Sequence, residues 1–339
     1  MDIDNSCYVS RKDKRKNKKK NKIKIIKHII LFFVFEVMLT TITFPLYIFY
    51  GPFKDVRNLI VEISMSTGNH QYIAKLFLND EEIDEILNGT SKQTSIDTEI
   101  FSTVESEGTL ENIIQHDITD EKFDGIALVV KDPIRVKVGY SSKLGEVGET
   151  ISKMASNYNA VAAINGGGYE DTKGDSNGGI PIGILISDGN VIYPKSEKKY
   201  NDKHVVFSID SNGKMFVGEA SVNELLEMDS QQAMSFGPTL IVDGEPYISE
   251  TTVGGINPRT AIGQMSDGSI ILLTIDGRKL LKQGAKLEDV QEVMYRLGAV
   301  NAMCLDGGGS TAMYYNGEII NNISNLTGER CIPDIVYVK

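Results

Sequence analysis

The residues best suited to chemistry lie in one short stretch, Val300 to Thr311, which reads VNAMCLDGGGST. It begins as an apolar run long enough for one buried strand and ends in a carboxylate, three glycines and two hydroxyls. Glycines in such a turn let backbone N–H groups approach a ligand, and the hydroxyls add donors. We therefore predict that this stretch forms half of a site for a sugar-phosphate substrate, with these contributors: Asp306, Gly307, Gly308, Gly309, Ser310 and Thr311.

Two other apolar runs end at polar residues in the same style. Residues 160–164 lead into NGGGYE at 165–170, and residues 269–275 lead into DGR at 276–278. In the first motif Asn165 is expected to hydrogen-bond a sugar hydroxyl, and Gly166 and Gly167 are expected to line the substrate beside it. The alternative for Asn165 is that its side chain fixes a turn. Glu170 is a candidate acid or base, and the alternative is an exposed loop glutamate.

Glycosyl transfer uses two carboxyl groups, one as acid or base and one as nucleophile or charge stabiliser. Asp276 and Asp306 are the predicted pair. Arg278 and Arg259, with Thr260 next to it, are predicted to bind phosphate, because guanidinium groups offer fork-shaped donors. The alternative for an Asp-Gly pair is a hairpin turn, and we apply it to 188–189 and 243–244.

The sequence lacks the motifs typical of nucleotide hydrolysis, serine hydrolysis and zinc binding. GGGST has neither the lysine nor the spacing of a Walker A loop, and no Gly-x-Ser-x-Gly elbow occurs. Cysteine and histidine residues show no zinc-site spacing, and the four histidines are scattered. Cys304 lies in an apolar run and is expected to be buried, although a pairing with Cys331 stays open.

The charge is divided sharply along the chain. Residues 1–50 hold eleven Lys/Arg and four acidic residues, so they carry +7 and the remaining residues carry −18 of the total −11. An acidic body disfavours nucleic-acid binding. Residues 29–50 are 22 mostly apolar residues after a basic run, which predicts a single-pass anchor with the N-terminus in the cytoplasm. A buried helix and a cleaved signal peptide are the alternatives.

The elements that must position these motifs are short strands and a few helices. Hairpin turns, and helices expected at 71–87, 148–158, 221–228 and 286–297, predict an α+β fold with a twisted mixed sheet and flanking helices. The strand 269–276, the helix 286–297 and the strand 299–306 are expected to form one βαβ crossover, which would place Asp276 and Asp306 on neighbouring parallel strands. The predicted parts are a basic tail 1–28, an anchor 29–50, a helical and polar stalk 51–119, and a domain 120–339.

The ordered motifs resemble those of the phosphodiester glycosidase family. The resemblance rests on AAINGGGYED at 162–171, SNGGIPIGILISDGNV at 176–191, SFGPTLIVDGEP at 235–246, GINPRTAIGQ at 255–264, ILLTIDGR at 271–278 and AVNAMCLDGGGSTAMYYNGEIIN at 299–321. It covers about 160–339, with weaker similarity back to about 120, and is greatest to membrane-anchored bacterial members described as exopolysaccharide-related. The GST at 309–311 departs modestly from the family's usual glycine–serine ending.

The resemblance implies hydrolysis of the bond between a sugar's anomeric carbon and a phosphodiester oxygen. The expected substrate is a surface glycopolymer or related glycoconjugate outside the cell, and a divalent cation between carboxylates and phosphate would suit the acidic body. Two alternatives remain open: a non-catalytic carbohydrate- or wall-binding module, and a structural envelope assembly protein. The protein partners, the stereochemical outcome and the roles of the two carboxylates are not determined by the sequence.

Overall fold

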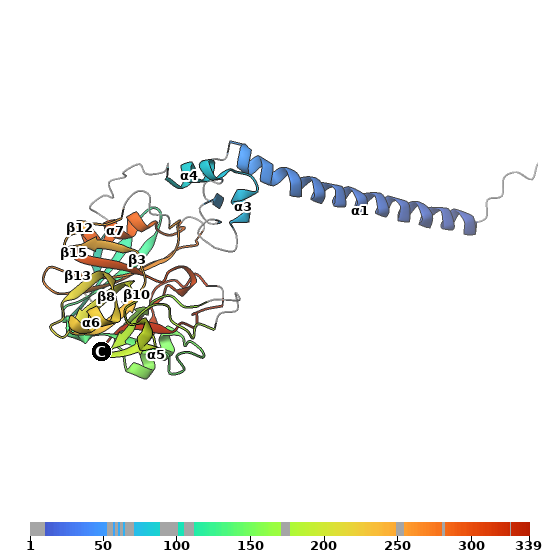
Figure 1. Cartoon of the computed structure of the whole chain (residues 1–339). Coiled ribbons are helices and arrows are strands. Elements are labelled where there is room, and N and C mark those ends of the chain that lie inside the picture. The colour runs from blue at the N-terminus through green and yellow to red at the C-terminus, as the bar shows by residue number, and fades with distance from the viewer. Residues whose placement is uncertain are drawn as a thin grey trace, which may run out of the picture. The chain divides into compact units, whose positions relative to one another are not determined.

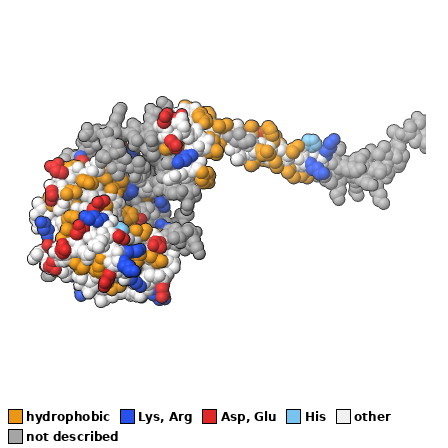
Figure 2. Space-filling view, in the orientation of Figure 1, with side chains coloured by type: hydrophobic (Ala, Val, Ile, Leu, Met, Phe, Trp, Pro, Cys, Tyr) orange, Lys and Arg blue, Asp and Glu red, His pale blue; other side chains and the backbone are white. Residues whose placement is uncertain are grey.

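A computed structural model describes residues 11–52, 57, 60–61, 64, 71–88, 101–104, 112–170, 177–248, 254–279, 282–325 and 327–339. The chain forms two compact units, Met1–Leu87 and Asn88–Lys339. The first unit begins with α1 (Arg11–Tyr50), in which the segment Ile26–Tyr50 has a mean hydropathy of 2.2 and is long and apolar enough to cross a membrane. Figure 2 shows the apolar side chains along this helix. The predicted N-terminal apolar helix is confirmed.

The rest of the first unit is a small helical cluster. The helix expected at 71–87 is divided into α3 (Tyr72–Lys75) and α4 (Asp80–Asn88). Asn79 causes the restart, because its side chain accepts a hydrogen bond from Glu82 N at 2.8 Å while Glu82 bonds back to Asn79 N at 3.0 Å. The apolar residues of this cluster are Phe49, Val61, Ala74, Leu78, Ile83 and Ile86.

The second unit contains three sheets, and every strand pairing in them is antiparallel. The eight-stranded sheet has the order β1 (Phe101–Val104), β2 (Ile113–Thr119), β3 (Asp124–Val130), β14 (Ile270–Ile275), β13 (Arg259–Met265), β15 (Ala299–Leu305), β11 (Thr239–Val242) and β12 (Glu245–Pro246). A second sheet has the order β7 (Asn190–Tyr193), β6 (Leu185–Ser187), β10 (Ser230–Ser235), β8 (His204–Asp210) and β9 (Met215–Ala220). The third has the order β17 (Glu318–Ile319), β16 (Met313–Tyr315), β5 (Ala162–Asn165), β18 (Asp334–Val338) and β4 (Val136–Tyr140).

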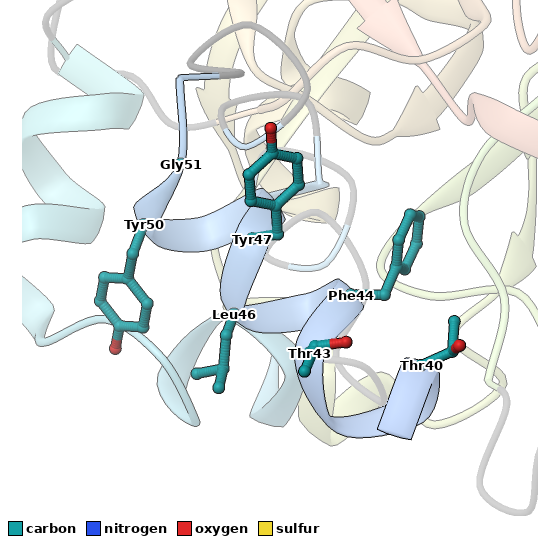
Figure 3. A pocket seen from close by; sticks show the side chains of 7 residues that line it. All are labelled: Thr40, Thr43, Phe44, Leu46, Tyr47, Tyr50 and Gly51. Carbon is teal, nitrogen blue, oxygen red and sulfur yellow. The ribbon is translucent and has the colours of Figure 1, made fainter. Parts of the chain in front are cut away.

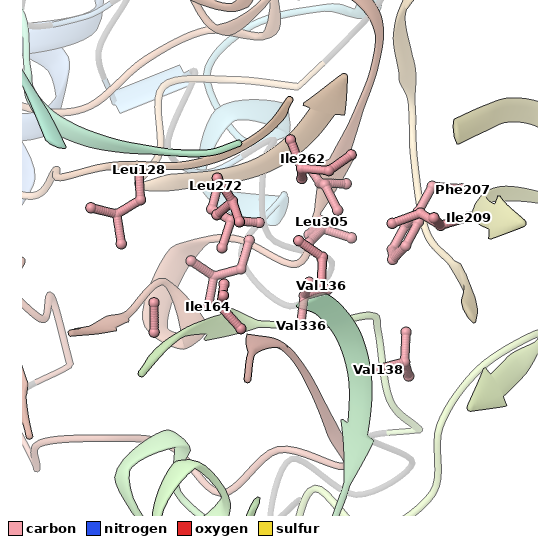
Figure 4. Close-up of a cluster of buried hydrophobic side chains, with 14 of the residues drawn as sticks. Leu128, Val136, Val138, Ile164, Phe207, Ile209, Ile262, Leu272, Leu305 and Val336 are labelled. Atoms are coloured by element: carbon pink, nitrogen blue, oxygen red, sulfur yellow. The ribbon is translucent and has the colours of Figure 1, made fainter. Parts of the chain in front are cut away.

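The three sheets share one central core, part of which Figure 4 shows. Leu128, Ile164 and Phe207, one from each sheet, all belong to it. The outer face of each sheet carries its own cluster and one helix: α7 (Leu287–Arg296) on the eight-stranded sheet, α6 (Val222–Glu227) on the second and α5 (Ile151–Tyr158) on the third. Strands such as β14 therefore bury alternate residues in two cores, which explains their continuous apolar sequence.

Local signals in the sequence correspond to these elements. The Ser221 hydroxyl accepts from Glu224 N and the Glu224 carboxylate from Ser221 N, so the capping box at the start of α6 is confirmed. Asp188 and Asp243 have positive φ values of 47° and 50° and are followed by glycines at 75° and 83°, as hairpin turns require. Short 3₁₀ helices complete the regular structure: η1 (Pro133–Arg135), η2 (Glu197–Lys199) and η3 (Gly308–Ser310). The predicted α+β class is confirmed (Figure 1).

The expected βαβ crossover is wrong in one respect. Strands β14 and β15 are parallel to each other, but β13 lies between them and pairs antiparallel with both. The helix α7 therefore spans one intervening strand, which the local sequence could not indicate. Asp276 and Asp306 still follow strands that end at the same edge. The polar segment expected as a stalk contains β1 and β2, and β2 pairs with β3 along its whole length.

Candidate active site

The candidate site is built where the ends of several strands meet. Asp276 follows β14, Asp306 follows β15, and Thr260, near the start of β13, lies opposite both Thr274 and Leu305. Asn165, at the end of β5, belongs to a different sheet, yet its side-chain Nδ2 donates to the Asp306 backbone oxygen at 2.5 Å. Two sheets therefore contribute to one cluster.

Asn165 is the centre of a fully buried polar network. Its Oδ1 accepts from the Thr260 hydroxyl at 2.7 Å and from Ala312 N at 3.3 Å. The Thr311 hydroxyl lies 3.4 Å from that of Thr260. Because Asn165, Thr260 and Thr311 are all buried, these side chains hold the loops that follow β5 and β15 in fixed positions. The structure brings these three predicted site residues together.

Asp306 follows this network directly. Its Oδ1 accepts from Gly307 N at 2.9 Å. Burial raises the pKa of the Asp306 carboxyl, while the Ser310 hydroxyl, the Gly307 N–H and the charge of Arg330 act in the opposite direction. The Ser310 hydroxyl is itself buried and faces the Asp306 carboxyl group, although the two make no hydrogen bond of normal geometry.

Two guanidinium groups lie against the glycine turn. A Cβ atom built on Gly308 would lie 3.2 Å from Arg278 Nη2, and one built on Gly309 would lie 3.5 Å from Arg330 Nη1. Burial lowers the pKa of Arg278, and the nearby positive charge of Arg330 lowers it further. Within the described residues neither guanidinium forms an ion pair with a carboxylate. Two adjacent like charges of this kind favour an anionic ligand.

Arg278 also has an unusual backbone. Its φ is +58°, in the left-handed region that residues with a side chain rarely adopt, and its N–H bonds to Gln283 O at 2.8 Å. This conformation places the side chain against Gly308 instead of continuing the direction of β14. Strained backbone of this type is often found at functional sites.

The glycine turn uses its backbone N–H groups differently from the sequence prediction. Gly307 N bonds to Asp306, Gly308 N to Pro258 O at 2.9 Å, Ser310 N to Gly307 O at 3.2 Å and Thr311 N to Gly308 O at 3.4 Å. These four groups are therefore engaged within the protein. The charged donors that the geometry offers to an anion are the two guanidinium groups.

Asp276 is buried and surrounded by donors. Its carboxylate accepts from Asn322 Nδ2 at 2.6 Å, Asn322 N at 3.0 Å, Asn321 Nδ2 at 3.3 Å and Lys279 Nζ at 3.3 Å. Asn321 also donates to Thr311 O at 3.4 Å. The structure therefore places Asp276 as the anchor of the 321–322 loop, with its oxygens occupied by protein donors.

The other predicted residues have different surroundings. Arg259 is largely buried and donates to three backbone oxygens, from its Nε to Ala285 O at 3.1 Å and from its Nη2 to Gly254 O and Gly255 O. Burial lowers the pKa of this guanidinium. Glu170 is exposed at the surface, where its N–H bonds to Ile180 O at 2.9 Å. Neither side chain is shown in contact with Asp306.

The structure adds residues that the motifs did not indicate. Asp334 opens β18, is 1% exposed, and accepts a hydrogen bond from Gly167 N at 2.7 Å. Arg330 stacks over the Tyr169 ring with its Cζ 5.7 Å from the ring centroid. Asp334 precedes an apolar strand instead of following one, so a search for strands that end in polar residues misses it. Antiparallel pairing reverses the direction of β18 and places Ile335 opposite Asn165, so that Asp334 lies next to Gly166, just beyond the end of β5.

The cysteines and carboxylates show neither a disulfide nor a metal cluster among the described residues. Cys304 is buried and Cys331 exposed, and both are free thiols. Burial raises the pKa of Cys304 to about 12, so this thiol is inert as a nucleophile or metal ligand near neutral pH. In the part of the chain that the structure describes, no three His, Cys, Asp or Glu side chains are grouped to hold a metal ion. The donor set at the site thus fits an anion better than a cation.

Surface hollows in the described part of the chain lie elsewhere. One, of about 600 Å³, is lined by residues of α1 and its end, Thr40, Thr43, Phe44, Leu46, Tyr47, Tyr50 and Gly51 (Figure 3). Another, of about 680 Å³, is lined by Asn201, Lys203, Ser221, Asn223, Glu224, Leu226 and Glu227. The first follows one side of an apolar helix, and the second carries an exposed Lys203–Glu224 ion pair of 2.9 Å. Neither contains the buried carboxylates and free guanidinium groups found around Asp306.

Residues 158–339, which include every part of this cluster, match the family model of the phosphodiester glycosidases. The chain belongs to the phosphodiester glycosidase family. The matched region begins at the end of α5 and contains Asn165, Thr260, Asp306 and Asp334. The family membership that the sequence motifs indicated is thereby confirmed.

Relatives of this member of the family include proteins from bacteria and mammals. It is 33% identical over 197 residues to the SPbeta prophage-derived uncharacterized protein YomE of Bacillus subtilis (strain 168), covering 56% of this chain and 30% of that protein. It is 27% identical over 188 residues to N-acetylglucosamine-1-phosphodiester alpha-N-acetylglucosaminidase of Bos taurus, covering 50% of this chain and 34% of that enzyme. The chain thus spans about a third of the length of the curated relatives it matches.

Solved structures agree with this placement. The catalytic domain of the zebrafish N-acetylglucosamine-1-phosphodiester alpha-N-acetylglucosaminidase, auto-inhibited by its pro-peptide, has a TM-score of 0.54 and 25% identity, covering 72% of this chain and 85% of that one. A hypothetical protein from Synechocystis has a TM-score of 0.56 at 15% identity, covering 72% of this chain and 64% of that one. The second likeness concerns the fold alone.

Proposed function

We propose that this protein hydrolyses the bond between a sugar's anomeric carbon and a phosphodiester, with Asp306 as the catalytic carboxylate. The observation that carries the proposal is the pair of guanidinium groups, Arg278 and Arg330, at a glycine turn that follows the partly buried carboxylate of Asp306, which the Ser310 hydroxyl also faces. This arrangement can hold the phosphate and the anomeric carbon side by side. Family membership and the 25% identity to the zebrafish catalytic domain support the same chemistry.

The reaction needs one bond to form and one to break. A water oxygen bonds to the anomeric carbon, and a proton of that water passes to the Asp306 carboxylate. The bond between the anomeric carbon and the phosphate oxygen breaks, and its electron pair stays on the phosphate oxygen. A phosphate is a weak base, so stabilising its charge matters more than protonating it. Arg278 and Arg330 supply that stabilisation.

We further propose positioning roles for three residues of the motifs. Asp276 fixes the 321–322 loop, Asn165 aligns the backbone of Asp306, and Arg259 holds the turn around Gly254. Glu170 is proposed as a surface contact to the sugar at the rim of the site, next to Tyr169. The three positioning roles follow from the hydrogen bonds of the Asp276, Asn165 and Arg259 side chains, and the role of Glu170 follows from its exposure beside Tyr169.

The proposed location is the outer face of a bacterial membrane, with α1 as the anchor. The apolar segment of α1 and the basic residues that precede it support this orientation. The substrate would then be a surface glycopolymer or its precursor with a sugar-1-phosphodiester linkage. Exopolysaccharide and cell-wall polymers are the two classes of substrate to test first.

The test is release of N-acetylglucosamine from the methyl diester of α-N-acetylglucosamine-1-phosphate by the full chain in detergent micelles. Asp306→Asn should lower kcat by about 10²-fold or more, and Arg278→Ala or Arg330→Ala should lower kcat/KM by about 10²-fold. Asp202→Asn, at an exposed position, is the matched control. Release that is unaffected by Asp306→Asn would refute the assignment, and binding without release would favour a non-catalytic carbohydrate-binding module.

A further inference from the structure

A second buried carboxyl group lies beside Asp306 and has no role in the reaction described so far. Asp334 belongs to β18, whose next residue, Ile335, lies opposite Asn165. Gly166 N donates to the Asp334 backbone oxygen at 3.1 Å, and Gly166 O accepts from Asp306 N at 3.0 Å. The N–H of Gly166 thus holds the backbone of Asp334, and its carbonyl oxygen holds the backbone of Asp306.

The absence of a side chain at Gly166 allows this close approach. A Cβ atom there would lie 2.2 Å from Asp334 Oδ1 and 2.8 Å from the Asp334 backbone oxygen, far inside contact distance. The Asp334 carboxyl group therefore occupies the space that a side chain at position 166 would need. The next residue, Gly167, supplies the N–H that holds Oδ1.

The surroundings of the two carboxyl groups are unequal. Three groups lower the pKa of Asp306 against the effect of burial: the Ser310 hydroxyl, the Gly307 N–H and the charge of Arg330. Asp334 receives the Gly167 N–H and faces the negative charge of Asp306, and within the described residues it forms no ion pair. Burial raises the pKa of Asp334 to about 7; the Gly167 hydrogen bond lowers it and the Asp306 charge raises it. The groups that set the ionisation of this pair are therefore Asp306, Asp334 and Arg330.

We propose that Asp334 is the positioning partner of Asp306, and that at neutral pH the two carboxyl groups hold one proton between them, on Asp334. The inference rests on the proposed function for its catalytic meaning. While Asp334 is neutral, Asp306 is the ionised member of the pair and can accept the proton from water. When Asp334 ionises, a second negative charge enters the pair and repels the phosphodiester.

An infrared titration of the full chain in micelles tests the shared proton without any substrate. The wild-type protein should lose the carbonyl absorption of a buried protonated carboxyl group with a midpoint near pH 7. Asp334→Asn should remove this transition, and Asp306→Asn should move its midpoint to lower pH because the neighbouring charge is gone. The proposal is overturned if the transition survives Asp334→Asn, or if its midpoint is the same with and without Asp306. The Asp306→Asn measurement keeps the test decisive even if Asp334→Asn fails to fold.

The dependence of kcat/KM on pH tests the positioning role, because kcat/KM reports the ionisation of the free protein. With the methyl diester substrate, wild-type kcat/KM should fall tenfold for each pH unit above the midpoint, and Asp334→Asn should abolish this basic limb. A merely structural role would lower kcat/KM equally at all pH values and leave the limb in place, which would refute the inference. If the wild-type protein releases no sugar, the proposed function fails, and the infrared titration still decides whether the carboxyl groups share a proton.

Discussion

Replacing Asp334 with asparagine should remove a large pH dependence of stability. Asparagine has nearly the same shape as the neutral acid, and its Oδ1 can still accept from Gly167 N. In the wild-type protein the pKa of Asp334 is raised from 3.8 to about 7 by burial. The folded state therefore keeps a proton that the unfolded chain releases, and stability falls as the pH rises between these two values.

The size of the effect follows from the shift. A difference of about 3 pKa units, at about 1.4 kcal/mol per unit, gives a loss of about 4 kcal/mol once the pH exceeds the folded pKa. About 3 kcal/mol of this loss should fall between about pH 5 and pH 8. The Asp334→Asn variant should lack this decline, so its advantage over the wild type should grow as the pH rises.

Urea unfolding of the full chain in micelles, followed by tyrosine fluorescence, measures this difference. The protein has no tryptophan, and ten of its fourteen tyrosines lie beyond residue 88, so the signal reports mainly on the second unit. Asp202→Asn, at an exposed position, is the control and should follow the wild type. Parallel curves for the wild type and Asp334→Asn from pH 5 to pH 8 would refute a buried proton on Asp334.

Other predictions concern the packing around the site. Thr260→Val keeps the shape but leaves the buried Asn165 oxygen short of a donor, so the free energy of unfolding should fall by about 1–3 kcal/mol in urea titration, and no change would contradict the network. Gly166→Ala should destabilise more than Gly268→Ala, because a Cβ meets Asp334 in the first case, whereas in the second it enters open space and only the positive φ of 90° opposes it; equal melting temperatures would disagree. Arg278→Lys should retain weak binding of the methyl diester but raise its KM about tenfold in steady-state assays, since a lysine lacks the fork-shaped donors, and an unchanged KM would argue against phosphate contact.

Much of the local structure was predictable because it depends on neighbouring residues. The capping box at Ser221, the hairpin turn at Asp188 and the amphipathic helix α7 each follow from a few adjacent side chains. The arrangement of strands was not predictable in the same way. Nothing within 269–306 indicates that β13 inserts between β14 and β15, because that pairing depends on which apolar faces meet in three dimensions.

The residues of the candidate site also divide into those indicated by local sequence and those that depend on long-range contacts. Asp306 and Arg278 were predictable, since each stands at the end of an apolar run beside glycines. Arg330 and Asp334 were not, because the first lies in a polar loop and the second begins a strand. Their relevance comes from contacts between distant parts of the chain, the turn at Gly309 and the motif at Gly167. A search that includes the first residues of buried strands as well as the last would have found Asp334.

The position of β18 determines when the site can be assembled during synthesis. β18 lies between β5 and β4 and pairs with both, and the bond from Gly167 to Asp334 joins residues 167 positions apart. Before β18 is synthesised, the edges of β4 and β5 that it joins have no strand between them, although β5 can already pair with β16 on its other side. The two halves of the Gly167–Asp334 contact therefore come together only after nearly the whole of the second unit has been made.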